Sequence, residues 1–421
     1  MRQKLLLILL LVLFLFFLES CTMIKMGSLF LSGKMEQKNY KKEIECEYQR
    51  GLIFIKVRIN NTPRIYKFIF DTGAAFNVIS KDIALELNLQ KKVSDKISDA
   101  NLKTKKVEFV KIKDIEFAGL HFFDSAAAVM DLQGTTLKCY AADGVIGANI
   151  IRHVPYWQIN YKKGKMIITD KPGLISDKNK FFTIPFKPNI QRIPIIEIIA
   201  DNGIKLKFVV DLGSTGGFRG NFNQFQKICK SNIDFRYYER YGEISGGALG
   251  IKKGVEYTGK LNNLKIGDLS INSELIDFLD NVDPSVGNKF FENFIFTLDW
   301  KNKKILLFPI TDPMITEEKG SFGFSVSYRE DKKYLYISAI CKNSPAYNAK
   351  LKVGDIIVGL NKKNMRYLEF SEYCYWLFHK ANELFEKENY IYLEIERKNK
   401  ILNIGLHKKD WLKNSIMVQE N

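Results

Sequence analysis

The sequence predicts a mainly β protein with two similar lobes followed by a small α/β domain. Three observations support this prediction. From Gly51 onward, short apolar runs alternate with turns that contain glycine and asparagine, which is typical of strands. The pattern of the first half of the chain then recurs in the second half at a fixed spacing. A third segment, from about residue 317, combines strand-like runs with one helical stretch.

Length and composition agree with a folded chain of several domains. The 421 residues suffice for two or three domains, each with its own core. Apolar residues make up 46% of the chain and include 31 Phe and 19 Tyr. This composition is typical of a globular protein and excludes a disordered one.

The N-terminus has the features of an export signal. Two basic residues precede an apolar run from Leu5 to Leu18, which is shorter than the roughly 20 residues of a membrane-spanning helix. The run ends at Leu18-Glu19-Ser20-Cys21, which resembles a bacterial lipobox, although a glutamate is unusual at its position. The resemblance implies a signal peptide over residues 1–21, lipidation of Cys21, and an extracytoplasmic, membrane-anchored lipoprotein. An ordinary secretory signal and an uncleaved anchor are the alternatives.

Residues 22–48 are polar and rich in Lys and Glu, which predicts a tether between the membrane and the first lobe. The net charge is +17, but the lysines are scattered through strand-like segments, and no helix-turn-helix, RNP-like or zinc-finger pattern is found. We therefore expect no nucleic-acid partner. Attraction to anionic lipid head groups is a more natural use of the charge, and solubility would also explain it.

Histidines and cysteines predict no metal site and no cofactor. The four His are isolated from one another, and no two Cys have the spacing of a metal clip or a redox pair. Five cysteines remain beside Cys21 and allow at most one or two disulfides. Most of them are expected to be small buried side chains.

Two segments of the chain are copies of one another. The second lies 140 residues after the first, and the same spacing relates Asp143 to Asp283 and Gly147 to Gly287. Agreement in one register indicates gene duplication and two lobes, because a solenoid would repeat every 20 to 50 residues. We expect lobe one over residues 49–178 and lobe two over residues 179–312. The copies are Lys67-Phe68-Ile69-Phe70-Asp71-Thr72-Gly73 and Lys207-Phe208-Val209-Val210-Asp211-Leu212-Gly213.

Each copy ends an apolar strand with a carboxylate in a tight turn. A single Asp-Thr-Gly is a weak signal, because such triplets are common in turns. The signal is stronger here because the repeat places Asp211 at the point in lobe two that Asp71 occupies in lobe one. Two carboxylates from equivalent turns are candidates for one catalytic pair.

The motif Phe70-Asp71-Thr72-Gly73-Ala74 and the later Val145-Ile146-Gly147 resemble the aspartic peptidases, specifically retropepsin-like domains of bacterial proteins with two lobes in one chain. Lobe two has the poorer match Ser285-Val286-Gly287. The resemblance covers about residues 51–309 and implies the bilobal acid-protease fold. It also implies an aspartic-type endopeptidase acting on peptides or proteins that are exported or belong to the envelope. Asp71 and Asp211 would be the catalytic residues, supported by Thr72, Gly73, Gly213 and Ser214.

Two close carboxyl groups cannot both ionise, so they share one proton and activate a water between them. Thr72 can make a hydroxyl-to-backbone bond between the lobes, but Leu212 stands where the family has Thr or Ser and cannot make it. Ala74 also lacks a hydroxyl near the carboxylates, whereas Ser214 has one. The alternative function is a catalytically inactive scaffold of the same fold that holds a partner.

Turns between each Asp and its later Gly are expected to cover the cleft as flaps. The candidates are Ile97-Ser98-Asp99-Ala100-Asn101 in lobe one and the glycine-rich segment from Ile244 to Gly250 in lobe two. A plain hairpin tip is the alternative interpretation of both segments.

The C-terminal segment, residues 317–409, resembles a PDZ domain. The stretch from Ser344 to Asn361, with Val353-Gly354-Asp355-Ile356-Ile357, matches that family well. Phe322, Gly323, Phe324 and Ser325 stand where the family binds the carboxylate of a peptide C-terminus. The resemblance therefore implies a peptide C-terminus as a second partner. A small α/β domain that only covers the lobes is the alternative.

Overall fold

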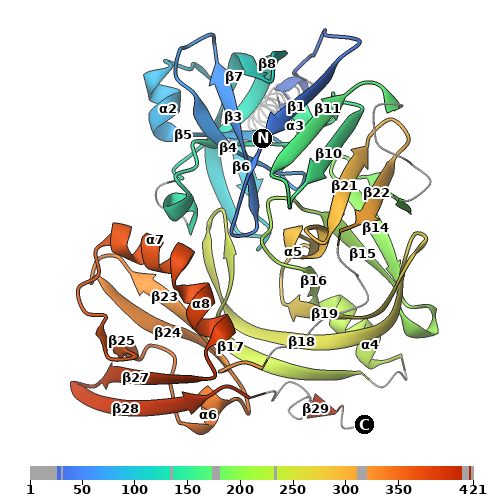
Figure 1. Cartoon of the computed structure of the whole chain (residues 1–421). Coiled ribbons are helices and arrows are strands. Elements are labelled where there is room, and N and C mark those ends of the chain that lie inside the picture. Colours follow the sequence, from blue (N-terminus) through green and yellow to red (C-terminus); the bar gives the residue numbers. More distant parts are fainter. Residues whose placement is uncertain are drawn as a thin grey trace, which may run out of the picture.

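The protein is described by a computed structural model over residues 26–29, 32–132, 136–172, 181–231, 235–310, 320–409 and 417–418. Strands dominate these residues and form three sheets with short helices between them, which confirms the mainly β prediction (Figure 1). Residues 1–25 and 30–31 lie outside the described residues, and with them the expected signal peptide, Cys21 and part of the expected tether. No helix in the described ranges is long and apolar enough to cross a membrane.

The first lobe is built on an eight-stranded sheet. Its central strand, Tyr66–Phe70, is apolar almost throughout because both of its faces are buried, and it runs parallel to Gly144–Ile146. The pairing places the predicted Val145-Ile146 segment directly beside the strand that ends at Asp71. In sheet order the strands are β2 (Glu47–Gln49), β3 (Leu52–Ile59), β4 (Tyr66–Phe70), β9 (Gly144–Ile146), β5 (Asn77–Ser80), β8 (Leu120–Met130), β7 (Thr104–Phe117) and β6 (Lys91–Ser98).

The second lobe repeats this arrangement. Its central strand again runs parallel to the later short strand, with Val209 beside Ser285 and Val210 beside Val286. The poorer sequence match at Ser285-Val286 therefore occupies the same structural position as Val145-Ile146. The strands of this lobe, in sheet order, are β13 (Lys187–Pro188), β14 (Pro194–Ile199), β15 (Lys205–Val210), β20 (Ser285–Val286), β16 (Phe218–Asn221), β19 (Leu269–Leu279), β18 (Gly250–Ile266) and β17 (Arg236–Gly247).

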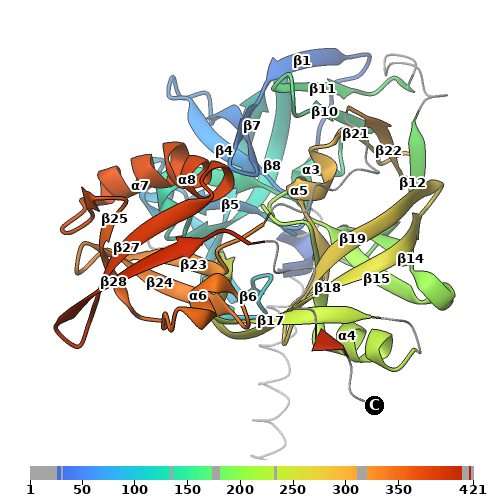
Figure 2. The same cartoon turned by 60° about the horizontal axis from the view of Figure 1, so that its bottom comes forward.

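A six-stranded sheet joins the lobes on the side away from the C-terminal domain (Figures 1 and 2). At its centre, corresponding strands of the two lobes pair antiparallel, and the buried Gln158 amide donates to Thr297 Oγ1 at 3.1 Å. This pairing of two copies of one strand agrees with the duplication seen in the sequence. The strands are β1 (Lys41–Glu45), β11 (Lys165–Thr169), β10 (Tyr156–Asn160), β21 (Phe294–Asp299), β22 (Lys304–Pro309) and β12 (Phe182–Pro185).

The tether prediction is wrong for its last part. Residues 41–45 form β1 at the edge of the six-stranded sheet, and residues 47–49 form β2 at the edge of the first lobe. Polar, Lys- and Glu-rich segments of this kind suit edge strands as well as tethers, because one face of an edge strand meets water.

Short helices connect the strands of the lobes. Most are one or two turns long, and α3 and α5 follow the two equivalent glycines Gly147 and Gly287. One continuous apolar core fills both lobes, with Phe70, Trp157 and Leu212 among its fully buried members. The helices are α2 (Lys81–Glu86), η1 (Thr136–Tyr140), α3 (Ala148–Ile151), η4 (Asp201–Gly203), α4 (Phe222–Cys229) and α5 (Asn288–Phe291).

The C-terminal domain has its own core of strands and helices, as predicted for a small α/β domain. The one helical stretch expected in this segment is divided at Lys380 into two helices. The strands are β23 (Phe324–Arg329), β24 (Tyr334–Cys341), β25 (Ile356–Leu360), β26 (Lys363–Asn364), β27 (Tyr390–Arg397) and β28 (Lys400–His407), and the helices are α6 (Pro345–Asn348), α7 (Phe370–His379) and α8 (Ala381–Lys387).

This domain is attached to both lobes. Its strand β24 pairs with β17 of the second lobe, with Tyr241 opposite Ile340, so the large sheet runs from one domain into the other. Its helix α7 is joined to η1 of the first lobe by a disulfide between Cys139 and Cys374. Strand β29 (Met417–Val418) also pairs with β17. The domain therefore lies beside the lobes and is joined to both of them (Figure 2).

Candidate active site

A cleft of about 2240 Å³ separates the lobes. Asp71 and Asp211 lie at its floor, and residues of the C-terminal domain, including Tyr328 and Tyr373, line the same cleft. Within the described ranges, no three His, Cys, Asp or Glu side chains are grouped so as to hold a metal ion.

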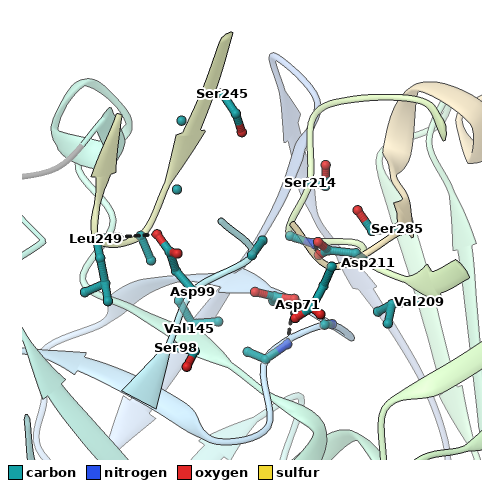
Figure 3. Close-up of a pocket in the computed structure, with 18 of the residues that line it drawn as sticks. Asp71, Ser98, Asp99, Val145, Val209, Asp211, Ser214, Ser245, Leu249 and Ser285 are labelled. Atoms are coloured by element: carbon teal, nitrogen blue, oxygen red, sulfur yellow. Dashed lines mark hydrogen bonds between the residues drawn. The ribbon is translucent and has the colours of Figure 1, made fainter. Parts of the chain in front are cut away.

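The structure brings Asp71 and Asp211 together. Each follows the last residue of a central strand, and its backbone N–H donates to the neighbouring short strand, at Ile146 O (3.0 Å) or Val286 O (2.9 Å). The two carboxyl groups are close enough for each to shift the pKa of the other, and they lie side by side in Figure 3. Equivalent turns in two lobes thus deliver two carboxyl groups to one point.

The glycines after each Asp make this close approach possible. A Cβ on Gly73 would lie 2.7 Å from a carboxyl oxygen of Asp211, and a Cβ on Gly213 would lie 2.3 Å from a carboxyl oxygen of Asp71. The Gly73 N–H also donates to Asp71 Oδ1 at 2.7 Å, and the Gly213 N–H donates to Asp211 Oδ1 at 3.0 Å. Each glycine therefore orients the Asp of its own lobe and makes room for the other.

Burial raises the pKa of both carboxyl groups, because the charged form loses hydration. The negative charge of Asp211 raises the pKa of Asp71 further, and N–H groups of Gly73 and Ala74 oppose this rise. The pKa of Asp211 is held down by the positive charge of Arg219, and then by the Gly213 N–H and the hydrogen bond with Asp71. The pair therefore shares one proton, and the charge of Arg219 favours the ionised form of Asp211.

Thr72 makes the inter-lobe bond that its position predicts. Its hydroxyl is buried, donates to Val210 O at 2.6 Å and accepts from the Leu212 N–H at 3.0 Å. Leu212 makes no such bond through its side chain and is packed in the core with no exposure. The junction beneath the dyad is therefore asymmetric.

Asn288 was not recognised from the sequence, although it supports the same junction. Its buried amide donates to Leu212 O at 2.7 Å and to Gly51 O of the first lobe at 2.8 Å, and its Oδ1 accepts from the Tyr161 hydroxyl at 2.9 Å. It thus joins lobe two to lobe one on the side where Leu212 has no hydroxyl. Its place directly after Gly287 was the one signal that could have identified it.

Ser214 and Arg219 complete the second-lobe side of the cleft. The Ser214 hydroxyl accepts from the Gly216 N–H at 3.3 Å, so this hydrogen bond lies within its own turn. Arg219, on β16, was not recognised from the sequence because nothing in a single arginine signals proximity to the dyad. It lines the cleft and donates to Ser245 Oγ at 3.1 Å.

The two candidate flaps are hairpin tips that meet each other. Asp99, in the turn between β6 and β7, accepts at Oδ2 from the Leu249 N–H at 3.0 Å, as the dashed line in Figure 3 shows. The Ser245 hydroxyl donates to Asn101 Oδ1 at 2.8 Å, and Lys103 Nζ donates to Ile251 O at 2.7 Å. The hairpins therefore form a bridge between the lobes at the edge of the cleft.

The four expected carboxylate-binding residues of the C-terminal domain lie at the start of β23. Phe322 is buried in the core of the domain, and Gly323 has a positive φ of 80° that favours glycine. The Gly323 N–H donates to Ser321 Oγ at 3.0 Å, and Phe324 pairs with Ile340 in the sheet. The hydroxyl of Ser325 accepts from Arg240 Nη1 at 3.1 Å, which links this loop to strand β17.

Two family models match parts of the chain. Residues 55–150 match the family described as aspartyl protease, and residues 312–370 match the PDZ domain. A crystal structure of basic 7S globulin from soybean is similar at 8% sequence identity, covering 63% of this chain and 94% of that chain with a TM-score of 0.39. No curated protein matches the sequence. The chain carries a retropepsin-like aspartyl protease domain and, after it, a PDZ domain.

Proposed function

We propose that the protein is an aspartic-type endopeptidase in which Asp71 and Asp211 activate one water. The observation that carries the proposal is the mutual contact of the two carboxyl groups at the floor of a cleft, each placed against the glycine of the other lobe. A carboxyl pair of this kind holds one proton at a pH where two separate carboxyl groups would both be ionised.

In the proposed reaction, ionised Asp211 takes a proton from a water that lies against both carboxyl groups. Protonated Asp71 donates a hydrogen bond to the carbonyl oxygen of the scissile peptide, which becomes more electrophilic. Water attack gives a tetrahedral intermediate, and the proton on Asp211 then passes to the leaving amine. The Arg219 charge favours this division of roles because it lowers the pKa of Asp211.

The test is cleavage of a peptide library by Asp71→Asn, Asp211→Asn and the double variant. Residues that act as one unit are non-additive, so each single variant should lose nearly as much kcat/KM as the double variant. Circular dichroism should show that all three still fold. Near-normal cleavage by Asp211→Asn would refute the two-lobe dyad.

The second candidate is an inactive scaffold that binds peptides through the PDZ domain, and the hydroxyl missing at Leu212 favours it. The full chain carrying Asp71→Asn should bind peptides with a free C-terminus through the Gly323 loop and lose those whose C-terminus is amidated. Equal binding of both forms would exclude carboxylate recognition. Retained peptide binding by a wild-type chain that cleaves no peptide would support the scaffold.

We also propose export and a lipid anchor at Cys21. The apolar run before this residue motivates the proposal, and the Cys139–Cys374 disulfide supports it, because disulfides persist in oxidising compartments. Cys21→Ser should leave the protein unprocessed or release it from membranes in a fractionation experiment. Unchanged processing and membrane retention would refute the anchor.

A further inference from the structure

One pair of equivalent positions beside the dyad carries different chemistry in the two lobes. Val145 and Ser285 are equivalent because each is paired with the residue two before the Asp of its lobe, Ile69 or Val209. Val145 pairs with Val78 across β9 and β5, and Ser285 pairs with Arg219 across β20 and β16. Val78 and Arg219 therefore occupy the same place in their lobes, and all four residues line the cleft.

The first-lobe side of the cleft is apolar at this place. Val78 packs against a cluster that includes Leu52, Ile69 and Val145. A wall of this composition has no group that hydrogen-bonds a polar substrate side chain, and it favours an apolar one through removal of surface from water.

The second-lobe side carries the half-buried Arg219. Its Nη1 and Nη2 atoms donate to the hydroxyls of Ser245 (3.1 Å) and Ser285 (3.4 Å), while its buried Nε has no hydrogen-bond partner in the described residues. No carboxylate of the described chain forms an ion pair with it within 4.0 Å. By contrast, the nearby Arg240 is held by both carboxylate oxygens of Glu256, at 2.7 and 3.0 Å.

A guanidinium held only by neutral hydroxyls keeps its charge and part of its donor capacity for a ligand. Arginine binds a carboxylate through two parallel hydrogen bonds, and such bonds are stronger in a cleft that excludes water. The positive charge of Arg219 lowers the pKa of three carboxyl groups, but none of them forms an ion pair with it. These groups are Asp211, Asp283 and Glu256.

We propose that Arg219 makes the cleft selective for substrates with an acidic side chain, Asp or Glu, on the lobe-two side of the scissile bond and an apolar side chain on the lobe-one side. This inference rests on the proposed peptidase function, because it assigns the substrate class of the same cleft. Arg219 acts here on specificity by binding the acidic side chain of the substrate, beside its effect on the pKa of Asp211, and it neither accepts nor donates the transferred proton.

The experiment compares peptide pairs that differ only in Glu against Gln at each position flanking the cleaved bond. Wild type should prefer the Glu member at one position by roughly 10- to 100-fold in kcat/KM, the range expected for hydrogen bonds to a charged group. Arg219→Val, which copies the residue of lobe one, should lose this preference. Arg219→Lys should keep part of it, and Arg192→Asn should keep all of it, because Arg192 is a cleft arginine at an exposed position whose positive φ of 63° asparagine tolerates.

Binding separates failure of this inference from failure of the peptidase proposal. The Glu and Gln peptides are also titrated against the full chain carrying Asp71→Asn, with and without Arg219→Val. One outcome is that wild type cleaves no peptide, while Glu peptides bind more tightly than Gln peptides and only when Arg219 is present. In that case the selectivity stands and the peptidase function is refuted. If no Glu preference is found in either cleavage or binding, or if Arg219→Val retains it, the inference is overturned.

Discussion

The hydroxyl of Thr72 in the first lobe lies 3.0 Å from the backbone nitrogen of Leu212 in the second and accepts its N–H. The same hydroxyl donates to Val210 O, so one side chain satisfies two buried backbone groups of the opposite lobe. Leu212 has no hydroxyl to make the equivalent bond to the first lobe, and its side chain is packed in the core. The lobe junction under the dyad therefore depends on Thr72 from one side and on the Asn288 amide from the other.

Thr72→Val should destabilise the protein although it preserves the shape of the side chain. It leaves the Val210 carbonyl and the Leu212 N–H without a partner, and each buried unpaired group costs about 1–3 kcal/mol in the free energy of unfolding. Urea denaturation measures the loss. Thr72→Ser keeps the hydroxyl and should stay much closer to wild type, and equal stability of the Val and Ser variants would show that the bond contributes little.

Asn288→Ala should weaken the junction from the second lobe. It removes the amide that holds Leu212 O and Gly51 O, at an expected cost of about 1–3 kcal/mol, and it should also lower kcat/KM because the two carboxyl groups lose part of their alignment. Asn149→Ala is the matched control, since its buried amide bonds only within lobe one, to Ala126 O and Asn77 N. Equal activity of the two variants would exclude a special role for Asn288 in aligning the dyad.

The raised pKa of Asp71 predicts how stability depends on pH. Below the ordinary pKa of aspartate, folded and unfolded chains both hold the proton. As the pH rises above that value, the unfolded chain releases the proton first while the folded chain retains it, so the free energy of unfolding falls. The fall continues up to the raised folded-state pKa of Asp71, and the lost stability is not regained above it. Asp71→Asn carries no such proton.

The Tm of Asp71→Asn should therefore exceed that of wild type near neutral pH and approach it in acid, measured by thermal unfolding across a pH series. The same shift places the alkaline limb of the activity profile above the range of an isolated carboxyl group. A Tm difference that is constant at all pH values would contradict the raised pKa.

Loss of the Cys139–Cys374 disulfide should release the C-terminal domain from the first lobe. The two cysteines are 235 residues apart, and removal of a bond that closes a long loop costs about 2–4 kcal/mol. The Cys139→Ser/Cys374→Ser variant should unfold at lower urea and show faster hydrogen exchange in α7. Cys229→Ser removes a free, half-buried thiol and should change neither property. Unchanged exchange in α7 would mean that the β17–β24 pairing alone holds the domain.

The sequence by itself determined the two lobes, the PDZ domain and the positions of Asp71 and Asp211. These features are repeated or local: an apolar strand that ends in a carboxylate and a glycine has the same meaning in both copies. The role of Thr72 was also predictable, because it depends on which strand ends face one another when the copies pair.

Only the tertiary structure decided which residues from unlike segments meet. Part of the expected tether forms the edge strand β1, and Cys139 is joined to Cys374 by a disulfide. Arg219 and Asn288 lie beside the dyad. A single polar side chain has no period or repeat that reports its distant neighbours. Its surroundings depend on how the strands pair and how the two lobes close on one another. The free energy that drives this closure comes from burial of the whole apolar core, and not from the few polar residues that closure brings together.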